Sequence, residues 1–330
     1  MIKGKLLIPN ASKPFDGKYI LGHDGSNLRF STDGGLTFAT LSIPVNAFYN
    51  VRATMSGDGR YIRIVGTGGN VSNFNWHAII GSDDYGAYWS DISTQGDLGA
   101  IKMSNNGIKM VATLRGSYDY SIYQTHNLGY GGWNVASYGV TKNGMTNLAM
   151  TDDGDYLFAA SDIQYATYPI TSETYGQTWV DQVTISSNRC SGVAMSSSGW
   201  YRLIVYTPES SSSAFYVSSN QGSSYTQITN PMNTWAADPC VSHSGQYMCF
   251  TEAMGDIGVF VSTNYGSTWA KHNFLPDYGQ LMFPFSNENI WLLFPYTGNG
   301  YYRSENAGSS WTYVATGHNL YCLAINKFNL

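Results

Sequence analysis

The amino-acid sequence predicts an all-β fold, a seven-bladed β-propeller made of four-stranded antiparallel blades. The first observation behind this is composition: in 330 residues, only 12% are charged, whereas glycine (36) and tyrosine (26) are abundant. Such a chain is typical of many short strands joined by tight turns. The second observation is internal repetition, with a period of roughly 45 residues that runs through the chain, as expected for propeller blades.

The most regular repeated string, which we call the box, reads Ser-x-(Asp/Asn)-x-Gly-x-(Thr/Ser)-aromatic. The side chain at its third position is expected to accept hydrogen bonds from backbone N–H groups two residues on and so close a turn. Glycine at the fifth position supplies a positive φ, and the aromatic residue at the eighth packs between neighbouring sheets. Box copies begin at Ser31, Ser82, Thr125 (one residue longer), Ser172, Ser218, Ser262 and Ser304.

A second string, apolar-Met-Ser-x-(Asp/Ser/Asn)-Gly-x-Tyr, precedes each box. We interpret it as the hairpin between the first two strands of a blade (A and B), and the box as the turn between the last two (C and D). The two turns then share one face of the propeller. Copies of the second string begin at Met55, Met103, Met150 and Met195 and, in weaker form, at Phe15, Val241 and Phe285.

The two ends of the chain are expected to close the ring. The segment around Tyr321–Ile325 resembles another A strand, so it should pair with the N-terminal strands of the first blade. Seven periods use almost the whole chain, and closure leaves no open blade edge. We therefore expect residues 1–330 to form a single propeller domain.

The box resembles the Asp-box, or bacterial-neuraminidase repeat, of sialidases, xyloglucan-degrading glycosidases, sortilin-type receptors and non-enzymatic propellers. Aspartate remains only at Asp33 and Asp84; asparagine replaces it in four copies and Thr174 in one. The resemblance implies a sialidase-like propeller in which the boxes are structural. It also implies what a sialidase site would need: three converging arginines, a tyrosine nucleophile with a glutamate partner, and an aspartate. The Arg-Ile-Pro motif of that family is absent, which favours a non-catalytic member.

Ligand binding is expected on the opposite face, built by the B–C and D–A loops, which we call the loop face. These loops are rich in aromatic and amide side chains, the groups that stack on sugar rings and pair with hydroxyls. Packing of the same rings between blades is the alternative. The candidate ligand-binding residues are Trp76, Tyr118, Tyr120, Tyr165, Trp235, Tyr278 and Tyr296, with the carboxylates Asp119 and Asp162.

No residue is assigned a catalytic role. A glycoside hydrolase needs two carboxylates about 5–10 Å apart, and the sequence does not show whether any two loop aspartates converge. The leading hypothesis is a non-enzymatic propeller that recognises glycans or another cell-surface polymer. The alternatives are a glycoside hydrolase and a structural module of a virion. The loop aspartates are Asp97, Asp119, Asp162, Asp238, Asp256 and Asp277, and the arginines weighed for a sialidase site are Arg52, Arg115 and Arg189.

The net charge and the cysteine spacing limit which partners and cofactors are expected. The net charge of −5, without a basic stripe, argues against nucleic acid. We recognise neither a signal peptide nor a membrane span, and expect an extracellular or virion-surface location, with a polysaccharide or other virion proteins as partners. The four cysteines match no zinc spacing, so no metal or cofactor is expected. Cys240 and Cys249 flank one hairpin, where either a disulfide or two thiols would fit.

Overall fold

The structure is a computed structural model of the 330-residue chain, and most of its A–B turns, boxes and strands are described. The described residues are 4–5, 18–41, 48–68, 78–94, 98–114, 122–131, 133–135, 145–161, 169–182, 189–206, 214–228, 236–252, 258–272, 279–283 and 287–326. These residues form strands and turns but no helix, and so contain none long and apolar enough to cross a membrane.

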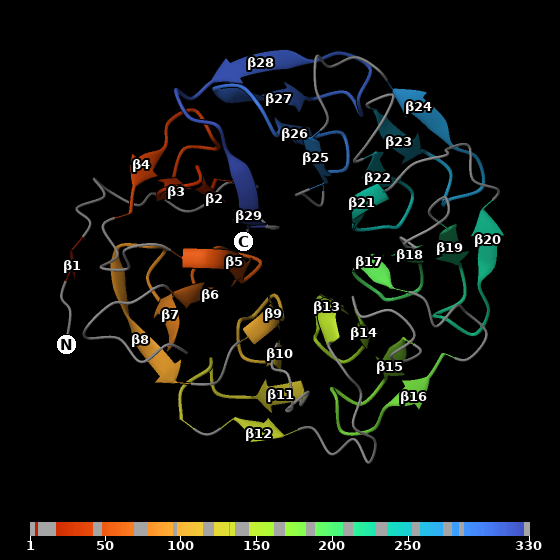
Figure 1. The fold of residues 1–330 in the computed structure, drawn as a ribbon, viewed down its shortest axis with the longest axis horizontal. Coiled ribbons are helices and arrows are strands. Elements are labelled where there is room, and N and C mark those ends of the chain that lie inside the picture. The colour runs from red at the N-terminus through yellow and green to blue at the C-terminus, as the bar shows by residue number, and fades with distance from the viewer. Residues whose placement is uncertain are drawn as a thin grey trace.

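The strands form seven antiparallel four-stranded sheets, arranged as blades in a ring around a central axis (Figure 1). This confirms the predicted seven-bladed β-propeller. The innermost A strands are β29 (Tyr321–Ile325), β5 (Phe48–Met55), β9 (Leu98–Met103), β13 (Met145–Met150), β17 (Cys190–Met195), β21 (Ala236–Val241) and β25 (Gly279–Met282). The B strands are β2 (Ile20–His23), β6 (Ile62–Gly68), β10 (Met110–Leu114), β14 (Leu157–Ser161), β18 (Arg202–Tyr206), β22 (Met248–Glu252) and β26 (Trp291–Pro295).

The outer strands are mostly shorter and more exposed than the inner ones. The C strands are β3 (Leu28–Ser31), β7 (Ala78–Ser82), β11 (Ile122–Thr125), β15 (Ile170–Ser172), β19 (Ala214–Ser218), β23 (Val259–Ser262) and β27 (Gly300–Ser304). The D strands are β4 (Ala39–Thr40), β8 (Tyr88–Thr94), β12 (Asn134–Val135), β16 (Val180–Asp181), β20 (Thr226–Ile228), β24 (Ala270–His272) and β28 (Thr312–Ala315). A further strand, β1 (Gly4–Lys5), pairs with β8.

The first blade joins the two ends of the chain, because its A strand is β29 and its B strand is β2. In a continuous A–B turn, the hydroxyl of Ser56 accepts the N–H of Tyr61 at 2.9 Å. In the first blade, the side-chain oxygen of Asn326 accepts the N–H of Tyr19 at 2.7 Å, and the Asn326 N–H donates to the Tyr19 carbonyl. Asn326 thus takes the place of the serine. The weak copy of the second string at Phe15 begins outside the described residues.

The hydrogen bonds that close the box turns differ from those predicted from the sequence. In the box at Ser262, the side chain of Asn264 accepts the N–H of Thr268, four residues on, at 2.9 Å. The N–H two residues on belongs to Gly266, and it donates to the Ser262 hydroxyl at 2.9 Å. The predicted acceptor was therefore wrong: the N–H two residues on binds the serine hydroxyl, and the asparagine side chain binds the N–H four residues on. In six boxes, the fifth-position glycine makes this bond to the first-position serine hydroxyl.

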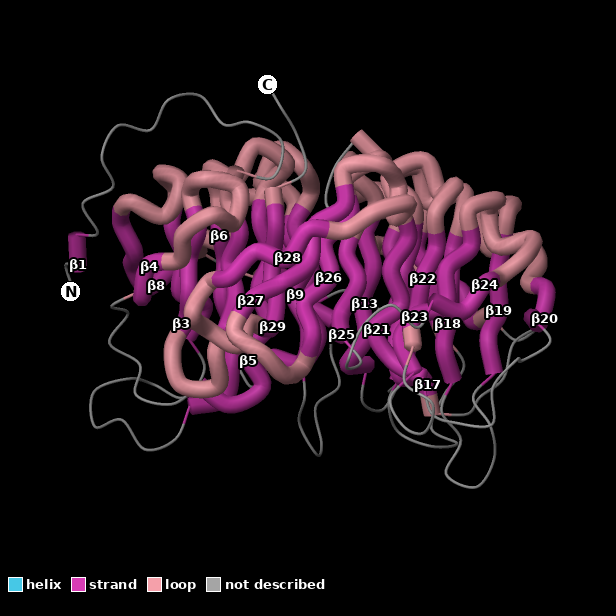
Figure 2. Tube along the Cα trace, turned by 90° about the horizontal axis from the view of Figure 1, so that it is seen from above, coloured by secondary structure: helices cyan, strands magenta, loops and turns pink. Residues whose placement is uncertain are grey.

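The two turns of each blade are tied to each other. In the sixth blade, the N–H of Tyr265, at the fourth box position, donates to the carbonyl of Gln246 in the A–B turn at 3.0 Å. The equivalent bond occurs in every blade. Consequently the A–B turns and the boxes share one face, which we call the turn face; Figure 2 shows most of the described turns along one side of the molecule.

The hydrophobic core lies between neighbouring blades. One cluster combines Val111 of the third blade with Leu157 and the box tryptophan Trp179 of the fourth. The Trp179 indole N–H donates to the carbonyl of the box glycine Gly176 at 3.0 Å, which anchors the ring as it packs. This confirms the predicted role of the eighth-position aromatic residue. Burying one such large apolar side chain is worth about 1.5–3 kcal/mol.

Candidate functional site

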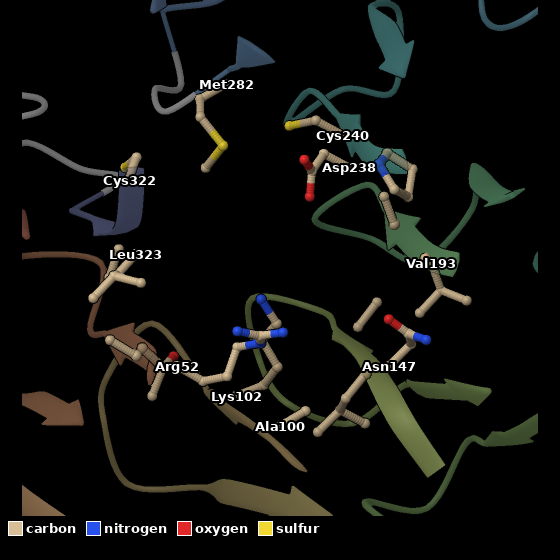
Figure 3. A pocket seen from close by; sticks show the side chains of 18 of the residues that line it. Arg52, Ala100, Lys102, Asn147, Val193, Asp238, Cys240, Met282, Cys322 and Leu323 are labelled. Atoms are coloured by element: carbon tan, nitrogen blue, oxygen red, sulfur yellow. The ribbon is translucent and has the colours of Figure 1, made fainter. Parts of the chain in front are cut away.

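The seven A strands surround a channel of about 390 Å³ (Figure 3). In six of the seven blades the pairing of the A strand with its neighbour shifts register. A bulge adds one residue to a strand and changes the direction of the side chains around it. In a regular strand, successive side chains point to opposite faces of the sheet. The bulges interrupt this alternation in the A strands, next to the channel.

Most of the residues that line the channel are small or apolar, and three of the described ones are charged. Arg52 comes from the second blade, Lys102 from the third and Asp238 from the sixth. Figure 3 shows the charged ends of Arg52 and Lys102 pointing into the channel, and Asp238 reaching in from another part of the wall. The neutral polar lining residues include Asn147, Ser191, Gln280 and Tyr321.

Asp238 is held by two tyrosines. Its carboxylate accepts hydrogen bonds from the hydroxyl of Tyr296 and, at 3.3 Å, from that of Tyr321. The two rings stack with their centroids 5.7 Å apart and an interplanar angle of 21°. Burial raises the pKa of both tyrosines, and the negative charge of Asp238 raises each further. Both hydroxyls therefore remain protonated and serve Asp238 as donors.

The backbone at Asp238 is unusual. Its φ is 49°, in the left-handed region, although Pro239 follows and favours extended backbone before it. The sequence prediction placed Asp238 in a loop; it lies instead within β21, where the register shifts between Ala237 and Cys240. The prediction was wrong because a bulge accommodates both the proline and the left-handed residue inside a strand. Strain of this kind, of order 1–3 kcal/mol, often accompanies functional positions.

The two cations lie on adjacent A strands, β5 and β9. Arg52 and Lys102 are both exposed, although they face the inner channel, and the side chain of Arg52 donates to the carbonyl of Val51 at 3.0 Å. Burial and the charge of Asp238 raise the pKa of Tyr321, whereas the positive charge of Arg52 lowers it. The charge of Arg52 therefore also acts on the side of the channel where Tyr321 lies. Sequence reasoning had not singled out Lys102. The repeat did contain a signal: the residue before the methionine of the second string is alanine at Ala149 and Ala194, but lysine at Lys102.

Of the residues predicted to bind ligand, Tyr296 is the one the structure describes. It follows β26 at the end away from the turn face, and the side chain of Asn319 donates to its carbonyl at 2.7 Å. Its hydroxyl is engaged by Asp238 and its ring by Tyr321, so its role as a ligand contact stays a prediction. Eight predicted residues lie outside the described residues: Trp76, Tyr118, Tyr120, Tyr165, Trp235, Tyr278, Asp119 and Asp162.

The cysteines are not disulfide-bonded. Cys240 and Cys249 lie directly opposite each other on β21 and β22, and Cys240 lines the channel. Burial raises the pKa of Cys249 well above its ordinary value, and a hydrogen bond with Cys240 adds to the effect. Within the described part of the chain, no group of three histidine, cysteine or acidic side chains is placed to hold a metal ion.

Comparisons with known proteins support the fold and leave the function open. No protein-family model and no curated protein matches the chain. A GH74 xyloglucanase from Xanthomonas campestris is 12% identical with a TM-score of 0.67, covering 93% of this chain and 55% of its own, so this chain spans about half of that enzyme. YCF48 bound to D1 peptide is 17% identical with a TM-score of 0.59, covering 88% of this chain and 91% of its own.

A third neighbour, from a nidogen/laminin complex, is 10% identical with a TM-score of 0.55, covering 76% of this chain and 91% of its own. The three neighbours thus include an enzyme, a protein bound to a peptide and a protein complex. At such low identity the similarity shows a shared propeller fold. Membership of the sialidase-like Asp-box family is not shown.

Proposed function

We propose that this chain is a non-enzymatic binding protein that holds a glycan, or another hydroxyl-rich cell-surface polymer, where the channel meets the loop face. The observation that carries the proposal is the stacked pair Tyr296 and Tyr321 around the carboxylate of Asp238. Tyr296 follows β26 and Tyr321 begins β29, so both lie at strand ends away from the turn face.

The chemistry of this cluster suits a sugar. Both tyrosines are partly exposed, and an aromatic ring can stack on the apolar C–H face of a pyranose. Asp238 and the nearby Asn319 offer a carboxylate and an amide that can pair with sugar hydroxyls. Because the two hydroxyls and the β21 backbone hold Asp238 in place, little entropy is lost when a ligand binds there.

The same cluster argues for binding rather than hydrolysis. A glycosidase needs a second carboxylate within about 5–10 Å, whereas Asp238 is the one carboxylate among the described residues that line the channel. The hydrolase alternative would require an aspartate from elsewhere, such as Asp119 or Asp162.

A glycan array with purified protein, followed by titration of the best ligand, tests the proposal. We expect Tyr296→Ala to weaken binding roughly tenfold, since a lost aromatic contact is worth about 0.5–1.5 kcal/mol. Tyr313→Ala is the matched control, because Tyr313 lies 47% exposed on β28, the outer strand of the same blade. Equal binding by the two variants and the wild type would contradict the proposed site.

A reducing-end assay separates binding from cleavage. We expect no sugar release from any polymer that binds. Release by the wild type that disappears in Asp238→Asn, Asp119→Asn or Asp162→Asn would establish a glycosidase and overturn the proposal.

We extend the proposal to location: the chain acts outside the cell or on a virion surface, in host recognition. Its composition, rich in glycine and tyrosine and poor in charge, supports this. Antibody should then label intact cells or particles, and labelling that requires lysis would contradict the location.

A further inference from the structure

One part of the channel wall carries sulfur atoms. Cys240 and Met282 line the channel there, and Cys249 is paired with Cys240 in the sheet of the sixth blade. We propose that Cys240 and Cys249 form a binding site for Cu(I), to which Met282 adds a third sulfur donor. This inference goes beyond the proposed function, because it uses none of the side chains assigned to the glycan.

The pairing of β21 with β22 brings the two thiols together. Cys240 is directly opposite Cys249, and Val241 and Met248 continue the same register, so the cysteines lie beyond the bulge. Directly opposed side chains share one face of the sheet, with Cβ atoms about 4.5–5.5 Å apart. A metal–sulfur bond is about 2.3 Å long, so one ion fits between two sulfurs that are about 4.6 Å apart.

The seventh blade supplies the third sulfur. The Cys249 thiol donates to the carbonyl of Leu281 on β25 at 3.6 Å, and β25 contacts both β21 and β22. Met282 follows Leu281, and Figure 3 shows its sulfur pointing into the channel near Cys240. A methionine side chain is unbranched and flexible, so its thioether can turn towards an ion that the two thiols hold.

The kind and number of donors favour Cu(I). Thiolates and thioethers are soft ligands that select Cu(I), whereas Mg²⁺ and Ca²⁺ prefer oxygen. A structural zinc ion needs four ligands, but two or three sulfurs are enough for Cu(I). In the part of the chain that the structure describes, no three cysteine, histidine or acidic side chains are grouped to hold a metal, so zinc lacks the ligands that it needs.

The ion reaches the pair through the channel. Cys240 lines the channel and is partly exposed, whereas Cys249 is fully buried. Burial, Cys240 and the charge of Asp238 all raise the pKa of Cys249, so its thiol keeps the proton until a metal replaces it. Binding converts Cu⁺ and two thiols into a copper dithiolate and two released protons. The positive ion offsets the repulsion between the two thiolates.

Anaerobic titration with Cu(I), in competition with the chelator bicinchoninate, tests the site. We expect the reduced wild type to bind a single Cu(I) ion, and both Cys240→Ser and Cys249→Ser to lose it. Cys190→Ser is the matched control and should bind as the wild type does, because Cys190 is also buried but lies on β17 in another blade. Copper uptake by Cys240→Ser equal to that of the wild type would overturn the site.

The variant Met282→Leu tests the third donor. It should weaken binding roughly tenfold, the lower end of what the loss of a supporting group costs a metal site. X-ray absorption at the copper edge should show three sulfur neighbours in the wild type and two in Met282→Leu. Equal numbers in the two proteins would remove Met282 from the site, and oxygen or nitrogen neighbours in place of sulfur would overturn the proposal.

A chemical block makes the test independent of how the variants fold. Dipyridyl disulfide oxidises two thiols to a disulfide and is itself reduced to two pyridinethiones. Wild-type protein in which mass spectrometry shows a Cys240–Cys249 disulfide should bind no Cu(I), and reduction of the disulfide should restore binding. Copper uptake that persists in the oxidised protein would place the metal elsewhere and contradict the proposed site.

Discussion

At the scale of single residues, each box turns through two successive left-handed residues. Gly266 has a φ of 80° and Tyr265, just before it, a φ of 60°. A residue other than glycine in this region is strained by roughly 1–2 kcal/mol. The hydrogen bond from the N–H of Tyr265 to the carbonyl of Gln246 offsets this strain, and the equivalent hydrogen bond recurs in every blade. The fourth box position therefore tolerates tyrosine, leucine, glutamine or alanine.

Replacing Gly266 with alanine should destabilise the protein by about 2–4 kcal/mol, since left-handed strain is added to overpacking. A Cβ atom there would lie 2.9 Å from Val217. The control is Gly25→Ala, because Gly25 has a similar φ of 88° with nothing within 4 Å of the added atom. Urea unfolding measures both. Equal losses would show that packing around the box contributes nothing.

The aspartate of the first box makes the turn sensitive to acid. Burial favours the neutral acid, but hydrogen bonds from Thr37 and Ser31 outweigh it and hold the pKa of Asp33 below its ordinary 3.8. A lowered folded-state pKa adds stability above the ordinary value, and this is lost as the pH falls through the lowered one. Asp33→Asn should therefore flatten the loss of stability below about pH 4.

The reverse exchange, Asn264→Asp in the sixth blade, should introduce the same acid sensitivity, because the side chain at this position already accepts the Thr268 N–H. Thermal unfolding between pH 2 and 6 measures both variants. Unchanged pH profiles would contradict a role for the carboxylate in the turn.

At the scale of strands, the bulged A strands and the pairing of β21 with β22 matter most. The register places Cys240 directly opposite Cys249, the arrangement that the hairpin pattern had indicated. Directly opposed residues have Cα atoms about 4.5–5.5 Å apart, within the range that a disulfide spans. Cys240 lines the channel, whereas Cys249 is fully buried. A reagent should therefore reach Cys240 first.

Treatment with dipyridyl disulfide should link the pair. The Cys240 thiolate attacks the reagent and releases one pyridinethione; Cys249 then attacks the mixed disulfide and releases the second. We expect two pyridinethiones per protein, a mass loss of two hydrogens and a higher melting temperature. Cys249→Ser should stop at the mixed disulfide. A stable mixed disulfide in the wild type would show that the two sulfurs cannot meet.

At the scale of the whole molecule, hydrogen bonds link the A–B turns of the second to sixth blades. The Gly57 N–H donates to the Asn105 carbonyl, and the Asn105 N–H to that of Asp152. The chain of bonds continues through Ser197 to His243. These bonds tie the second to sixth blades to one another on the turn face, in addition to the packing of the core. The first blade depends in addition on β29 and Asn326 to hold the two chain ends together.

Asn326→Ala should remove the acceptor of the Tyr19 N–H, which is buried, and destabilise the protein by about 1–3 kcal/mol. Ser56→Ala is the matched control, because it removes the equivalent acceptor from a continuous turn. Hydrogen exchange should be faster in β29 for Asn326→Ala alone, since opening there separates the chain ends. Equal protection of β29 in both variants would contradict a special role for Asn326 in closure.

The sequence by itself determined the blades. A positive φ at Gly266 and the anchoring of Trp179 depend on residue type and near neighbours, so a repeated string predicts a repeated turn. The same local pattern could not show that the Asn264 side chain binds the N–H four residues on, because that choice follows from the neighbouring left-handed residue.

Only the tertiary structure decided the channel. Arg52, Lys102 and Asp238 lie on three different blades, and they line the same channel because the blades close into a ring. Asp238 reaches its tyrosines because a bulge in β21 turns it, and bulges depend on how two strands pair rather than on either strand alone. A repeat specifies its own hairpins through short-range contacts, whereas the inner surface of a ring is shared by all its blades and is specified by none of them separately.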